Sequence, residues 1–152
     1  MAIQFIPGQV ATGDPYPNAP TALSGPVKDL QTRVVKLSSA NFTTTGTNTL
    51  VAVLPADATI ISFRTWVKTA LAGNSVASPT VTLGSTSAGT DYASTVALTN
   101  TTGTYAFVTP VTGIIQAYNP PYSADLNIWF KGGCSTGNPT SGEVYLIIEY
   151  VR

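Results

Sequence analysis

The sequence predicts an all-β protein, an antiparallel β-sandwich of the jelly-roll type with about eight strands and an extended N-terminal arm. Two observations favour this fold. From residue 32 onward, runs of alternating apolar and polar residues are divided by glycine, proline, asparagine and aspartate, and no run of ten or more residues has a convincing helical period. Eight or nine short strands in about 120 residues are typical of a jelly roll.

Residues 1–31 are expected to form the arm, and residues 32–152 the sandwich domain. Prolines at positions 7, 15, 17, 20 and 26 exclude a helix or a central strand from this first segment. A disordered tail is one interpretation. Against it, the segment carries large apolar side chains, which favour contact with the chain's own domain or with a neighbour. The interface candidates within the arm are Phe5, Ile6, Tyr16 and Leu23.

The first four strands are expected at residues 32–38, 49–54, 59–69 and 79–83. Val35 and Leu37 of the first strand lie two positions apart and should both point inward. A polar, turn-rich link leads to the second strand, which ends at the turn signal Leu54–Asp57. The third strand is the longest, and Val81 and Leu83 share the inner face of the fourth.

Five further strands are expected at residues 92–98, 104–109, 113–118, 124–131 and 143–151. The sequence Asn119–Pro121 breaks the chain before the eighth strand, and the glycine-rich stretch 132–142 predicts a long flexible loop before the last one. The last strand has apolar residues on both faces, which favours a central position in its sheet.

Alternation also predicts the two faces of the third strand. Its inner face should carry Ile61, Phe63, Thr65 and Val67. Its outer face should carry Ile60, Ser62, Arg64, Trp66 and Lys68.

Trp66 is anomalous because this large apolar ring shares its face with Arg64 and Lys68. The eighth strand repeats the arrangement with Trp129 and Lys131. A tryptophan can contribute about 2 kcal/mol or more to an interface. We therefore expect the two rings to contact a partner subunit. They share one outer surface if their strands belong to the same sheet, which the sequence leaves open. Cover by the chain's own arm or a loop, isolated exposure, and stacking against a sugar are the alternatives.

Composition excludes several kinds of partner. Only 9% of the residues are charged, and seven acidic residues balance seven basic ones. Such a chain has no field that would attract DNA or RNA, so no nucleic acid is expected. No apolar run reaches the ~20 residues of a membrane span, so no membrane partner is expected either. The N-terminus lacks the features of a signal peptide, which predicts synthesis in a cytoplasm.

We do not expect an enzyme, a cofactor or a metal. There is no histidine to activate the 24 threonine and 12 serine hydroxyls. The single cysteine, Cys134, excludes an internal disulfide and a cysteine-based zinc site. Asp57 and Asp91 occupy turn or strand-start positions, and Asp125 and Glu149 occupy outward strand positions, which weakens the case for a carboxylate pair that hydrolyses glycosides. The stretch 132–142 lacks the lysine and the following helix of a phosphate-binding loop.

Three stretches, Thr49–Ile61, Thr80–Gly84 and Gly142–Tyr150, resemble small virion structural proteins of tailed bacteriophages. The chain is similar in particular to jelly-roll cement or decoration proteins, over roughly residues 32–152. The resemblance implies a capsid-surface protein that bridges neighbouring major capsid proteins. It also implies a homo-oligomer, dimer or trimer, with an extended arm. A tail-fibre or receptor-binding β domain and a carbohydrate-binding module are the alternatives.

Overall fold

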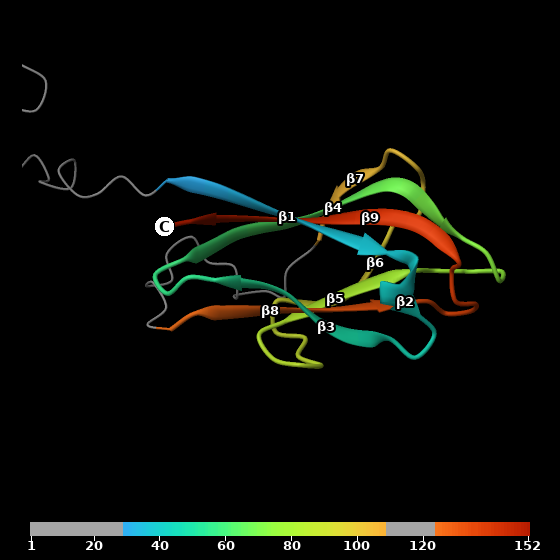
Figure 1. The fold of residues 1–152 in the computed structure, drawn as a ribbon, viewed down its shortest axis with the longest axis horizontal. Helices are drawn as coiled ribbons and strands as arrows, with labels where there is room; N and C mark the ends of the chain where they lie inside the picture. The colour runs from blue at the N-terminus through green and yellow to red at the C-terminus, as the bar shows by residue number, and fades with distance from the viewer. Residues whose placement is uncertain (1–28, 109–123) are drawn as a thin grey trace, which may run out of the picture.

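The computed structural model describes residues 29–108 and 124–152, which form a two-layered β-sandwich (Figure 1). Residues 1–28 of the arm expected at 1–31, and the strand expected at 113–118, lie outside these residues. A single turn of 3-10 helix, η2 (Ser39–Asn41), precedes β2. The strands are β1 (Leu30–Ser38), β2 (Phe42–Thr43), β3 (Thr47–Leu54), β4 (Thr59–Ala72), β5 (Thr80–Gly84), β6 (Ala93–Ala97), β7 (Tyr105–Phe107), β8 (Leu126–Gly133) and β9 (Ser141–Val151).

The all-β prediction is confirmed. Every strand expected within the described residues is present, and its ends differ from the predicted ones by at most three residues. The two-residue strand β2 has no counterpart in the sequence prediction, because a strand this short leaves no alternating pattern. β1 begins at Leu30, two residues before the expected start of the sandwich domain.

The strands pair in a nested order that defines a jelly roll. β1 pairs with β9, β3 with β8, β4 with β7 and β5 with β6, all antiparallel. These nested pairs form one long hairpin, which folds over on itself to give two sheets. One sheet has the order β1-β9-β4-β7. The second sheet has the order β2-β8-β5-β6, and β3 also pairs with β8. The predicted jelly-roll sandwich is therefore confirmed, and β9 is central in its sheet as expected.

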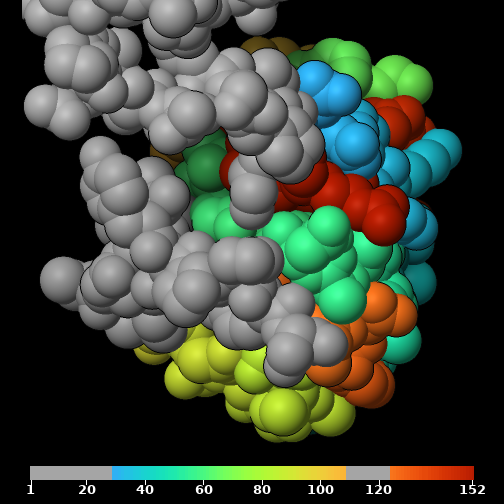
Figure 2. Space-filling model, turned by 90° about the vertical axis from the view of Figure 1, so that its left-hand side faces the viewer, coloured from blue at the N-terminus to red at the C-terminus, as the bar shows by residue number. Residues whose placement is uncertain are grey.

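The two sheets enclose one apolar core. At one end of the molecule, β1 and β9 lie side by side in one layer, with β8 in the other (Figure 2). Phe42 and Phe130 meet edge to face with ring centroids 5.5 Å apart, and Phe63 packs against Tyr92 at 5.7 Å. The largest fully buried side chains also include Leu37, Leu54, Leu83, Ile128, Leu146 and Ile148.

A β-bulge corrects the predicted faces of β4. The register with β9 shifts between Ile60 and Ser62, so Ile60 is buried and Ile61 is only partly so. The expected assignment of Ile61 to the inner face and Ile60 to the outer face is therefore wrong. An extra residue in one strand turns the side chains before it to the other face. From Phe63 to Val67 the predicted alternation holds.

The glycine-rich stretch 132–142 also differs from the prediction of a long flexible loop. β8 continues to Gly133 and β9 begins at Ser141, so a shorter connection remains. Hydrogen bonds anchor it: the backbone of Ser135 bonds to Ala77, and the Asn138 side chain accepts from the backbone of Thr44. Cys134 is buried, and its burial raises the pKa of the thiol.

The core predicts that two phenylalanines of opposite exposure contribute very differently to stability. Phe130 is 0% exposed and Phe107 is 64% exposed. Phe130→Ala should lower the free energy of unfolding by about 3–5 kcal/mol, since it leaves a cavity. Phe107→Ala should lower it by less than about 1 kcal/mol. Urea unfolding of both variants measures the difference, and equal losses would contradict this account of the core.

Candidate interaction face of the four-stranded sheet

Large apolar side chains are unusually exposed on the outer face of the four-stranded sheet. Seven large hydrophobic residues are exposed among the described residues. Two of them, Leu50 and Val53, belong to β3 in the other sheet. The other five come from β1, β4 and β7 and are Leu30, Val34, Trp66, Tyr105 and Phe107.

Strand register gathers the aromatic members of this group. Trp66 of β4 lies directly opposite Tyr105 of β7 on one side and Tyr145 of β9 on the other. The rings of Trp66 and Tyr145 are stacked, with centroids 5.3 Å apart and an interplanar angle of 26°. In the next row, Arg64 lies opposite Phe107. We call these five side chains, Arg64, Trp66, Tyr105, Phe107 and Tyr145, the aromatic face.

Arg64 joins the rings of the aromatic face. Its guanidinium lies 4.5 Å from the centroid of Phe107 and donates a 2.8 Å hydrogen bond to the hydroxyl of Tyr105. A second nitrogen forms a 2.8 Å ion pair with Glu149. The hydrogen bond with Tyr105 and the attraction of Glu149 raise the pKa of Arg64. The cation is therefore fixed within the sheet surface, where it supports the rings through cation–π contact.

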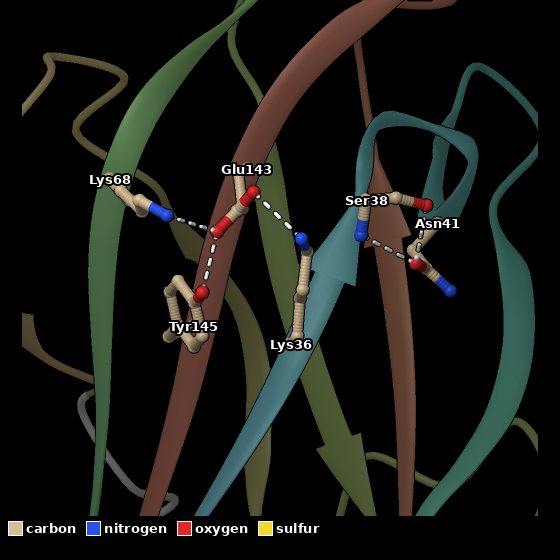
Figure 3. Close-up of polar contacts among 6 residues, drawn as sticks. All are labelled: Lys36, Ser38, Asn41, Lys68, Glu143 and Tyr145. Carbon is tan, nitrogen blue, oxygen red and sulfur yellow. Dashed lines mark hydrogen bonds and ion pairs between the residues drawn. The ribbon is translucent and has the colours of Figure 1, made fainter.

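Glu143 ties three strands together beside the aromatic face (Figure 3). It accepts from Lys36 of β1 at 2.8 Å, from Lys68 of β4 at 3.0 Å and from the hydroxyl of Tyr145 at 2.5 Å. These hydrogen bonds lower the pKa of Glu143 to about 2, and the hydrogen bond from Lys36 has the largest effect. The same contact raises the pKa of Lys68.

The two tryptophans do not share a surface, because their strands belong to different sheets. Trp66 lies in the four-stranded sheet and Trp129 in the five-stranded sheet, and their outward faces lie on opposite sides of the sandwich. Alternation predicts outward side chains correctly, but it contains no information on sheet membership. A sugar platform that uses both rings is excluded for the same reason.

Trp129 and Lys131 belong to a different surface. Trp129 is partly buried and lies opposite Leu50 of β3. Lys131 lines a hollow of about 400 Å³ with many threonine and serine side chains, among them Thr80 and Thr82. The remaining interface candidates Phe5, Ile6, Tyr16 and Leu23 lie outside the described residues, and whether any candidate touches a partner stays a prediction.

Three members of the aromatic face were missed from sequence. Tyr105 and Phe107 fall two positions apart in the strand expected at 104–109, and Tyr145 shares the outer face of the last strand with Glu143. The period-two spacing could have identified them as outward aromatic residues. No feature of the local sequence indicates that β7 pairs with β4 and brings these rings next to Trp66.

The described residues contain no group of three or more histidine, cysteine, aspartate or glutamate side chains placed to hold a metal ion. In the same part of the chain, no helix has the length and apolar character needed to cross a membrane. The aromatic face itself offers flat apolar area, ring edges and a fixed cation. These are properties of a contact surface, since aromatic residues and arginine are enriched at protein interfaces.

Two solved structures share the fold. A chain in the capsid of Ralstonia phage GP4 superposes with a TM-score of 0.57 at 16% identity, over 82% of this chain and 84% of its own. A chain in the capsid asymmetric unit of cyanophage Pam1 gives a TM-score of 0.56 at 16% identity, over 82% and 85%. No protein-family profile and no curated protein matches the sequence. At this identity the likeness concerns the fold.

The Glu143 contacts predict a specific acid dependence. Because the pKa of Glu143 is lowered from its ordinary value of 4.5 to about 2, its contribution to stability is complete above pH 4.5 and disappears as the pH falls toward 2. The difference in unfolding free energy between wild type and Glu143→Gln should therefore shrink across this range. Denaturant midpoints measured from pH 7 to pH 2 test this, and a difference that is constant with pH would contradict it.

Proposed function

We propose that this protein is a structural component of a bacteriophage particle, which binds the outside of the assembled capsid and holds neighbouring major capsid subunits together. The observation that carries the proposal is the shared jelly roll with chains found in two phage capsid structures. The matched region makes up nearly the same fraction of each chain, so these chains are of about the same length as this one. The likeness therefore extends over most of both chains and is not confined to a short part of either.

The aromatic face supports the same function and supplies the contact. Trp66, Tyr105 and Phe107 are each more than one third exposed, at 37%, 49% and 64%. Tryptophan, tyrosine and arginine are the residues that most often dominate interface energies. The neighbouring acids are already paired with Arg64, Lys36 and Lys68, so docking leaves few unpaired charges to desolvate. We assign the aromatic face to the capsid contact.

Such a protein acts through binding free energy alone. A ligand that binds only the assembled shell shifts the equilibrium away from disassembly, by an amount that grows with its concentration and affinity. Each copy needs only a modest contact, because many copies act on one particle. A copy that contacts two adjacent capsid subunits keeps each of those subunits at a high effective concentration near the other.

Copy number tests the proposal most directly. Quantitative gels of purified particles, washed with 1 M NaCl, should show hundreds of copies per particle. Retention is expected because apolar contacts are not screened by salt, whereas contacts between exposed charges are. A handful of copies would indicate a tail or receptor-binding protein instead, and loss in the salt wash would contradict an apolar contact.

The two tryptophans supply a matched pair for locating the contact. Trp66→Ala should weaken binding to capsids that lack this protein by at least tenfold, which corresponds to about 1.4 kcal/mol. Trp129→Ala, on the other sheet, should leave the dissociation constant unchanged. Sedimentation with purified shells measures both, and the melting temperatures show that both variants are folded. If only Trp129→Ala weakens binding, the capsid contact lies on the five-stranded sheet.

A further inference from the structure

Within residues 29–108 and 124–152, the backbone of β1 has one open edge. In this part of the chain β1 lies at the end of its sheet and pairs only with β9. The pairing runs from Leu30 opposite Val151 to Ser38 opposite Glu143 without a register shift. Regular edges of this length can accept another strand, and proteins usually protect them with bulges or by keeping them short.

The register shows which backbone groups are available. Asp29 and Arg152 exchange two backbone hydrogen bonds, of 3.1 and 3.3 Å. In an antiparallel ladder such pairs alternate, so residues 31, 33, 35 and 37 bond to β9. The N–H and C=O groups of the residues between them point away from β9. Among the described residues these groups have no partner at Leu30, Thr32, Val34 and Lys36.

Asn41 closes the far end of this edge. The N–H of Ser38, which also points away from β9, donates a 2.9 Å hydrogen bond to the side-chain oxygen of Asn41 (Figure 3). The available stretch therefore runs from Leu30 to Lys36, about 20 Å at the usual rise per residue. We call this stretch the β1 edge.

Apolar groups lie on both sides of the β1 edge. On the outer face, Leu30 is 64% exposed and Val34 is 56% exposed. On the inner side, Arg33 and the β3 stretch Leu50–Val53 line a hollow of about 430 Å³. A strand added here would gain backbone hydrogen bonds from the edge and would have a place for apolar side chains on each of its own faces.

We propose that the β1 edge receives residues 2–6 from the N-terminal segment of a second copy of this chain. This stretch, Ala-Ile-Gln-Phe-Ile, is free of proline and alternates, with Ile3 and Phe5 on one face and Ile6 on the other. With Phe5 opposite Val34, Phe5 and Ile3 would both lie on the outer side of the edge, and Ile6 would enter the hollow. Pro7 ends the added strand because it cannot continue a ladder.

Length and composition favour a second copy over the same molecule. Twenty-two residues, 7–28, separate the added strand from Asp29, and five of them are prolines. Proline-rich linkers are stiff and extended, so this spacer would span about 70 Å, more than three times the length of the β1 edge. A spacer of this reach is long enough to bring residues 2–6 to the edge of a second copy. The spacer contains only two charged residues, Asp14 and Lys28, whose charges are opposite in sign.

Disulfide trapping with the full-length protein tests the proposal in solution, without particles. Phe5→Cys protein mixed with Val34→Cys protein should give a disulfide-linked dimer on non-reducing gels under mild oxidation. Ser87→Cys, at an exposed loop position away from β1, replaces Val34→Cys in the control mixture and should give at least fivefold less dimer. The native Cys134 is buried and does not compete. Equal yields in both mixtures would overturn the proposal.

Further variants test whether the backbone of β1 is needed and whether the segment comes from a second copy. Thr32→Pro removes one outward N–H without touching the ladder to β9, and should lower the trapped yield at least fivefold, whereas Thr32→Val should not. Phe5→Cys and Val34→Cys in one chain should give linked oligomers. If this double variant gives only a faster-migrating monomer, the segment occupies its own edge and the second-copy proposal is wrong. Because no capsid is present, these results are independent of the proposed capsid contact.

Discussion

The antiparallel ladder between β4 and β9 determines which side chains enter the core and which face outward. Phe63 lies opposite Ile148 within the core, while Trp66 lies opposite Tyr145 on the outer face. Side chains alternate with a period of two, so a slip of one residue would exchange these sets and bury Arg64. The core and the aromatic face both depend on this register.

Five of the 14 charged residues form ion pairs on the outer face around this ladder. Glu143 on β9 contacts a lysine from each neighbouring strand, Lys36 of β1 and Lys68 of β4. Exposed ion pairs contribute only modest stability, so we interpret these contacts mainly as positional. They hold long side chains flat beside the rings, and they leave the aromatic face almost without net charge. This arrangement agrees with a chain in which only 9% of residues are charged.

Local pattern predicted most of the strands and most of their inward residues, because alternation is a property of neighbouring positions. Leu126, Ile128 and Phe130 are buried as expected. The bulge at β4 was not predictable, since Ile60 and Ile61 are equally apolar and either could face inward. The separation of Trp66 from Trp129 was not predictable either. Sheet membership follows from the nested pairing of strands far apart in the sequence, which no local period records.

The aromatic face and the β1 edge belong to the same sheet but point in different directions. Hydrogen bonds of an edge strand lie in the plane of the sheet, whereas outward side chains stand roughly perpendicular to that plane. A molecule held by Trp66 and Phe107 against one surface would therefore keep the backbone of Thr32 and Val34 open to a lateral neighbour. β3, with a register shift between Leu50 and Ala52, lacks the regular edge that β1 offers. The proposed capsid contact and the proposed contact at the β1 edge therefore point in different directions, so one copy can make both at once.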